Sequence, residues 1–102
     1  MDDASLLRRL LETVDRAKDV RIKPGLKQAL GAAFAAYEED KDELGLQQPS
    51  IKSLKGLLKF LSHPHRLEWL APSLAINPEG KFVAIWGETP NRYSVEFTME
   101  PE

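Results

Sequence analysis

Cysteine is absent from the 102 residues, and this absence excludes several kinds of chemistry at once. Without thiols the chain forms no disulfide bond, offers no thiolate nucleophile and builds no cysteine-ligated zinc site. The two histidines, His63 and His65, flank Pro64 in one short segment. Two neighbouring histidines need further ligands from elsewhere to hold a metal ion. We therefore predict no metal site and no cofactor.

The chain also lacks an excess of positive charge and a long apolar run. Fourteen basic residues stand against sixteen acidic ones, a formal net charge of -2, so no global positive field draws the protein to nucleic acid or to an anionic membrane. No apolar stretch approaches the roughly 18 residues of a membrane span, and the first residues are acidic rather than cationic. We therefore expect a cytoplasmic protein.

Length and periodicity predict one domain, residues 1–102, of class α+β. Apolar residues make up 42% of the chain and charged residues 29%, which is typical of globular proteins. Apolar side chains recur at helical spacing in three segments, about 5–18, 26–43 and 51–62. After Pro72 they alternate with polar ones in three short segments, about 73–76, 81–86 and 92–99. We expect three amphipathic helices packed on a C-terminal three-stranded antiparallel β-meander.

The predicted second helix follows a break at Pro24 and Gly25 and has two apolar faces. Its bulky face, expected in the core, consists of Leu26, Leu30, Phe34, Tyr37 and Leu44. Its other face is made of small residues: Ala29, Ala32 and Ala36. Either neighbouring elements of the same chain enclose this helix, or the alanine face is a contact in a homodimer.

The end of the second helix is acidic, with carboxylates at Glu38, Glu39, Asp40, Asp42 and Glu43. Negative charge at a helix C-terminus opposes the helix dipole and costs stability. Two explanations stay open. Either the helix frays near Glu39, or the acidic end is held in place because a basic group binds there.

The predicted third helix carries the only notable basic row, formed by Lys52, Lys55 and Lys59 on the side away from its leucine stripe. Further cations that could extend the row are Arg66, Arg21 and Lys23. The row is a candidate nucleic-acid surface. It has no interleaved aromatic residues and matches no DNA-binding motif, so we rank nucleic-acid binding second.

The predicted middle strand carries an unexplained pair of aliphatic residues. Phe82, Ala84 and Trp86 suit the core side of the sheet, and so do Tyr93, Val95, Phe97 and Met99 of the last strand. Alternation then places Val83 and Ile85 on the opposite face. Two aliphatic residues at the centre of an open sheet face form a candidate contact surface.

The segment from about Pro49 to Met99 resembles a pattern found in small uncharacterised bacterial proteins, in which a leucine-rich helix precedes a short β-meander. The residues that carry the resemblance are Pro49, Ser50, Pro72, Glu79, Gly80, Trp86, Glu96 and Phe97. Glu79 stands where the pattern has Asp in its turn, and Ile85 where it has an acid before the tryptophan. The resemblance implies the meander over half of the chain. That group has no assigned activity, so it implies no catalytic residues.

No nucleophile, paired carboxylates or glycine-rich phosphate loop stands in a recognisable catalytic arrangement. We therefore predict that the chain is not an enzyme. The leading hypothesis is a protein-interaction module that acts by surface binding, as an antitoxin, immunity or phage-type inhibitor protein, or as a homodimer. Its candidate contact residues are Val83 and Ile85 on the sheet, with Glu38, Glu39, Asp40, Asp42 and Glu43 at the acidic helix end.

Overall fold

The structure, a computed structural model, describes residues 2–17, 20, 22–63, 71–87 and 93–97. They form three helices and then three strands: α1 Asp3–Arg16, α2 Lys23–Leu44, α3 Ile51–Leu61, β1 Ser73–Ile76, β2 Phe82–Trp86 and β3 Tyr93–Phe97. The order matches the prediction, and the sheet packs against the helices, so the fold is α+β. Residues 18, 92 and 98–99, which the predictions also assigned to elements, lie outside the described residues.

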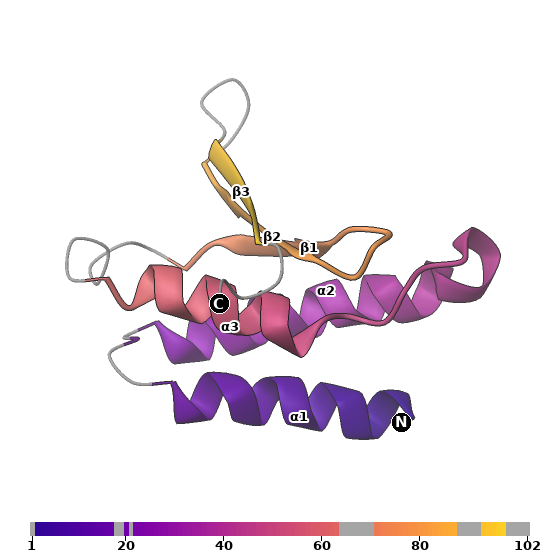
Figure 1. Cartoon of the computed structure of the whole chain (residues 1–102), viewed down its shortest axis with the longest axis horizontal. Helices are drawn as coiled ribbons and strands as arrows, with labels where there is room; N and C mark the ends of the chain where they lie inside the picture. Colours follow the sequence, from indigo (N-terminus) through magenta and orange to yellow (C-terminus); the bar gives the residue numbers. More distant parts are fainter. Residues whose placement is uncertain (1, 18–19, 21, 64–70, 88–92, 98–102) are drawn as a thin grey trace.

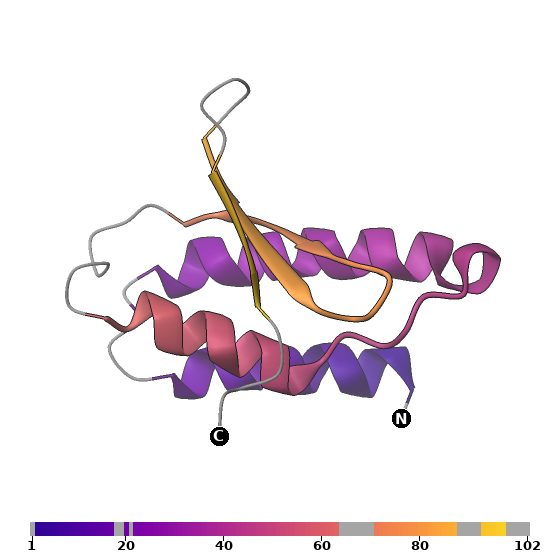
Figure 2. The ribbon, with the colours of Figure 1, turned by 45° about the horizontal axis from the view of Figure 1, so that its top comes forward.

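The elements are stacked in three layers, with the sheet on α2 and α3 and with α1 on the opposite side of those two helices (Figure 1). Strand β1 contacts α2, while β2 and β3 contact α3. In the turned view the strands cross above both helices (Figure 2). The core fills both layer boundaries and consists of Leu6, Leu10, Val14, Val20, Leu26, Leu30, Phe34, Tyr37, Leu54, Leu57, Leu58, Leu61, Phe82, Ala84 and Phe97.

The sheet has the strand order β1-β2-β3 with both pairs antiparallel, as predicted for a meander. Phe82 pairs with Phe97 and Ala84 with Val95, and the side chains of Phe82 and Ala84 are fully buried against the helices. Because successive side chains of a strand point to opposite faces, this register turns Val83 and Ile85 away from the helices. The predicted division of β2 into a core side, with Phe82 and Ala84, and an opposite side, with Val83 and Ile85, is confirmed.

Helix α2 begins earlier than predicted. Its first residue is Lys23, so Pro24 and Gly25 lie inside its first turn and do not form a break before it. The first N–H groups of a helix have no intrahelical acceptor, so proline removes no hydrogen bond there. Gly25 instead permits close packing, since a Cβ atom on it would lie 2.9 Å from the Cβ of Ala71.

Helix α2 also does not fray near Glu39 but continues to Leu44. Gly45 then adopts the left-handed conformation, with φ 62°, and its N–H donates to the carbonyl of Lys41, as does the N–H of Leu46. This cap satisfies carbonyl groups that a helix end leaves without partners. The last turn extends past the layer that covers the rest of the helix (Figure 2), and Leu44 is 66% exposed. The prediction that Leu44 lies in the core is therefore wrong.

The segment between α2 and α3 is held by the turn between β1 and β2. The N–H of Gln47 donates to Pro78 at 3.0 Å, and that of Ser50 donates to Gly80 at 2.8 Å. Gly80 has φ 83°, and a Cβ atom on it would lie 2.2 Å from the carbonyl oxygen of Gln48. Glycine is therefore required at this turn both for its backbone conformation and for the close approach of the linker.

A buried serine joins α3 to the sheet. The hydroxyl of Ser53 accepts a hydrogen bond from the N–H of Phe82 at 2.8 Å and donates one to the carbonyl of Phe97. These two residues are partners in the β2–β3 register, so the hydroxyl bridges the ladder at that pair. Ser53 is the one polar side chain among the fully buried residues of the described chain.

None of the helices within the described residues has the length and apolar composition needed to cross a membrane.

Candidate functional site

The outer face of the sheet, which is turned away from α2 and α3, carries the aliphatic pair predicted from the sequence. Val83 and Ile85 are both partly exposed at the centre of the middle strand. Their cross-strand neighbours on this face are small or polar: Ala75, Glu96, Ser73 and Ser94. No helix or strand of the described residues lies over this face (Figure 1). The pair therefore forms a small apolar centre with a polar border.

A hydrogen bond and an ion pair hold the side chains at one border of this outer face. The amide of Asn77 donates to the carboxylate of Glu96 at 2.9 Å, which links the β1–β2 turn to β3. Lys81 forms an ion pair with Glu79 at 3.0 Å, and this hydrogen bond raises the pKa of Lys81 above its ordinary value. These side chains already interact within the chain, so their positions at the border do not depend on a binding protein.

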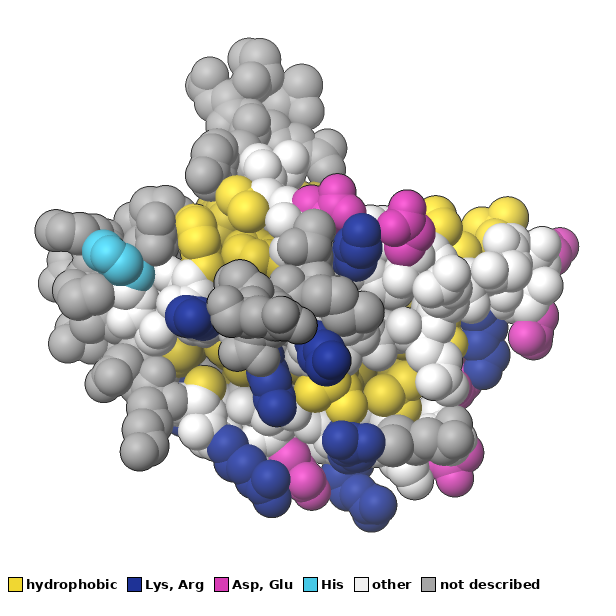
Figure 3. All heavy atoms as spheres, viewed as in Figure 1, with side chains coloured by type: hydrophobic (Ala, Val, Ile, Leu, Met, Phe, Trp, Pro, Cys, Tyr) yellow, Lys and Arg dark blue, Asp and Glu magenta, His cyan; other side chains and the backbone are white. Residues whose placement is uncertain are grey.

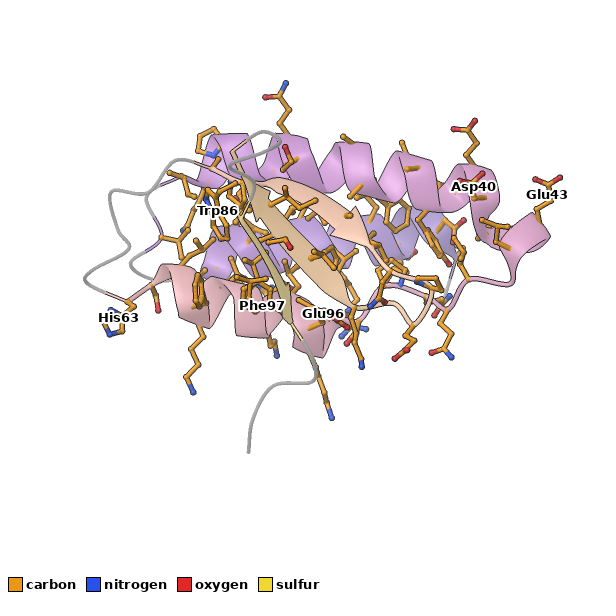
Figure 4. All side chains as sticks on the ribbon, turned by 90° about the horizontal axis from the view of Figure 1, so that it is seen from above. Asp40, Glu43, His63, Trp86, Glu96 and Phe97 are labelled. Carbon is orange, nitrogen blue, oxygen red and sulfur yellow. The ribbon has the colours of Figure 1, made fainter. Side chains whose placement is uncertain are left out.

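The acidic end of α2, defined here as Glu38, Glu39, Asp40, Asp42 and Glu43, projects from the molecule. All of these side chains are exposed. In Figure 4 the labelled Glu43 points away from the body of the protein, beyond the end of the helix. The acidic end belongs to α2, which contacts β1, whereas the aliphatic pair belongs to β2. The two surfaces that the sequence analysis grouped together are therefore separate.

Lys41 is the one basic residue within the acidic end of α2. Lys41 forms an ion pair with Asp3 at the start of α1, and both side chains are partly buried. The hydrogen bond that Lys41 donates to the Asp3 carboxylate is the main reason that the pKa of Lys41 is raised. Burial, with a smaller effect from Asp3, raises the pKa of the neighbouring Tyr37 hydroxyl. Lys41 thus ties the last turn of α2 to α1 but leaves the acidic end unpaired within the described residues.

The basic row of α3 lies along a groove that sequence analysis did not predict. This α1–α3 groove has a volume of about 560 Å³ and is lined by Arg9, Glu12, Thr13, Arg16, Ala17, Ile51, Lys55, Leu58, Lys59 and Ser62. Lys55 and Lys59 contribute from α3, and Arg9 and Arg16 face them from α1. Figure 3 shows Lys and Arg side chains gathered on this side of the molecule, with apolar surface between them.

The other cations of the nucleic-acid hypothesis do not extend the groove. Lys52 is exposed on α3 but does not line the groove. The ammonium group of Lys23 donates to the carbonyl of Asp15 at 2.9 Å, at the junction of α1 and α2. Arg66 and Arg21 lie outside the described residues.

A second, smaller groove of about 370 Å³ runs between α2 and the edge strand β1. Its lining is mostly apolar and consists of Ala32, Ala33, Ala36, Tyr37, Asp40, Leu44, Leu46, Leu74, Ala75, Ile76 and Pro78. Ala32 and Ala36 are exposed and line this groove, so β1 covers the alanine face of α2 only in part. The alternative of a homodimer contact at this face stays a hypothesis.

No group of three or more potential metal-ligating side chains occurs among the described residues. His63 is exposed at the end of α3, and His65 lies outside the part of the chain that the structure describes. Arg9 and Arg16 are the site residues that sequence reasoning missed. Their spacing of seven residues places them on one side of α1, but only the packing of α1 against α3 shows what that side faces.

Comparison with known proteins gives no relative: no protein-family model, no curated protein and no solved structure matches this chain.

Proposed function

We propose that this chain is a protein-interaction module whose binding surface is centred on Val83 and Ile85. The observation that supports this proposal is the outer face of the sheet, which no helix or strand of the described residues covers. The helices bury the opposite face completely at Phe82 and Ala84, whereas the aliphatic pair is partly exposed. Apolar side chains surrounded by polar ones are typical of the centre of a protein interface.

The size of the sheet limits what this surface does alone. Three strands about 4.8 Å apart, with five residues rising about 3.3 Å each, give a face of roughly 240 Å². A stable interface buries about 800 Å² per partner. The partner must therefore extend beyond the sheet. Strand β3 lies at an edge of the sheet and is a candidate for this extension, because an edge strand can pair with a strand of another protein.

An inhibitory role, as an antitoxin, immunity or phage-type inhibitor protein, is one form that such a module takes. It requires a stoichiometric complex in which the sheet face covers part of the partner. We expect the products of neighbouring genes to include that partner.

Co-expression of the tagged chain with each neighbouring gene product tests the proposal. One product should co-purify at a fixed ratio, and Val83→Asp should weaken the complex at least about tenfold, since it places a charge in the desolvated centre of the interface. Ala35→Asp is the matched control, because Ala35 is exposed on α2 and lines neither groove. Thermal unfolding of both variants checks that they remain folded.

A complex that forms equally well with folded Val83→Asp and with Ile85→Asp would show that the outer sheet face is not the binding surface. Failure of every neighbouring product to bind would count against the proposed partner.

A further inference from the structure

The α1–α3 groove has properties that the proposed sheet surface does not use. Positive side chains stand on both rims, with Arg9 and Arg16 on α1 and Lys55 and Lys59 on α3. Of these four, within the described chain, only Arg16 has a carboxylate partner, Glu12, at 3.9 Å, and both members of that pair are well exposed. Between the rims lie the apolar side chains of Ala17, Ile51 and Leu58. The groove therefore combines unpaired positive charge with an apolar floor.

An occupant of this groove has to supply negative charge and apolar surface together. A nucleic-acid backbone supplies the charge but leaves the apolar floor without a partner. Among the described residues, no aromatic side chain lines the groove to stack on a base. A helix with carboxylates along one side and an aliphatic residue at its end supplies both. The lining thus favours an acidic helix over nucleic acid.

The acidic end of α2 is a helix of this kind. Glu39 and Glu43 are four residues apart, about 6 Å along the helix axis, which is the spacing of Lys55 and Lys59 in the groove. Leu44 follows them and is the one large hydrophobic residue among those described that is strongly exposed. The acidic end therefore complements the groove: it carries negative charge at the spacing of the two lysines, and an exposed apolar side chain beside that charge.

The same molecule cannot make this contact. Helix α2 runs past the groove, so its acidic end lies at one end of the protein, while the basic side chains are gathered over α1 and α3 (Figures 1 and 3). We propose that the α1–α3 groove binds the acidic end of α2 from a second copy of this chain. The contact joins two different surfaces, so each copy can bind one neighbour through its groove and another through its helix end.

Light scattering of the purified full-length protein against concentration tests this assembly. The average mass should rise from the monomer value of 11.5 kDa as concentration increases at low ionic strength. It should return to that value at about 1 M salt, where the Debye length is roughly 3 Å.

Two charge-reversed variants examine the two surfaces separately. The groove variant is Lys55→Glu with Lys59→Glu, and the helix-end variant is Glu39→Lys with Glu43→Lys. All of these side chains are exposed. Each variant alone should lower the association constant at least about a hundredfold, because like charges then face one another across the contact.

A mixture of the two variants gives the sharpest result. The basic helix end of one variant then meets the acidic groove of the other, so the mixture should associate although neither variant does so alone. The matched control is Arg8→Glu with Lys52→Glu, which reverses two exposed cations on the same helices outside the groove. This control should retain association within about threefold, since charges outside the contact contribute little.

The proposal is overturned if the wild-type protein stays monomeric at all concentrations at low salt. It is also overturned if the control abolishes association as fully as the groove variant, or if the mixture of folded variants fails to associate. Binding of duplex DNA or RNA by a monomeric wild type, lost in the groove variant, would assign the groove to nucleic acid instead. None of these outcomes depends on the sheet face, because Val83 and Ile85 are unchanged in every variant.

Discussion

Replacing Ser53 with alanine removes a single oxygen atom but should lower the free energy of unfolding of the protein substantially. The hydroxyl is fully buried and serves two backbone groups, the N–H of Phe82 and the carbonyl of Phe97. A buried polar group left without a partner costs about 1–3 kcal/mol. The alanine side chain returns about 0.5 kcal/mol through its higher helix propensity. Two such groups cost about 2–6 kcal/mol together, so the expected loss in the free energy of unfolding is about 1.5–5.5 kcal/mol.

Urea unfolding followed by circular dichroism measures this loss. With a slope of about 1.5 kcal/mol per molar urea, the midpoint should fall by roughly 1–4 M. Ser62→Ala is the matched control, because Ser62 lies at the other end of α3 and its hydroxyl donates only to the carbonyl of Lys59 near the surface. The control should change stability by less than about 0.5 kcal/mol.

The same variant should also alter hydrogen exchange at one amide. If the Ser53 hydroxyl bridges β2 and β3, exchange at the Phe82 N–H should accelerate more than the global loss of stability explains. A loss of stability no larger than that of Ser62→Ala, with unchanged exchange at Phe82, would refute the bridging role.

Two further predictions concern the turn and the ion pair. Gly80→Ala should lower the free energy of unfolding by at least about 2 kcal/mol, because φ is positive and the new Cβ would meet the backbone of Gln48. Urea unfolding should show a clearly smaller loss for Gly45→Ala, since Gly45 has open space around it. Equal losses for the two variants would contradict the close approach of Gln48 to Gly80. The raised pKa of Lys41 stabilises the fold fully below the unfolded-state pKa of about 10.4, and this stability is lost as pH rises through the folded-state pKa. Urea midpoints at increasing alkaline pH should therefore fall more steeply for the wild type than for Asp3→Asn, and parallel curves would show that the ion pair does not contribute.

Much of the fold could be predicted from local patterns. The alternation in β2 and β3 correctly assigned Phe82, Ala84 and Phe97 to the core face, because side-chain direction in a strand follows from backbone geometry alone. The turn at Asn77 was predictable for the same local reason, and its side-chain oxygen accepts hydrogen bonds from the N–H groups of Glu79 and Lys81.

Predictions failed where a local pattern had two outcomes. Pro24 marks a break or a first helical turn, and only the chain around it decides which applies. Fraying at Glu39 was one of the two explanations for the acidic residues, but the helix continues five residues further, to Leu44, and Gly45 caps it. Ser53 gave no signal at all, since a serine beside a leucine stripe is equally consistent with an exposed position.

The sequence by itself determined the class of each element, the buried face of each helix and the side of β2 on which Val83 and Ile85 lie. These properties depend on residues a few positions apart. Tertiary structure alone decided that Ser53 meets Phe82 and Phe97, that Arg9 and Arg16 face the α3 lysines across a groove, and that the acidic end projects beyond it. Such pairings join residues that are distant in the chain, and the free energy that selects them comes from packing whole layers together rather than from any local period.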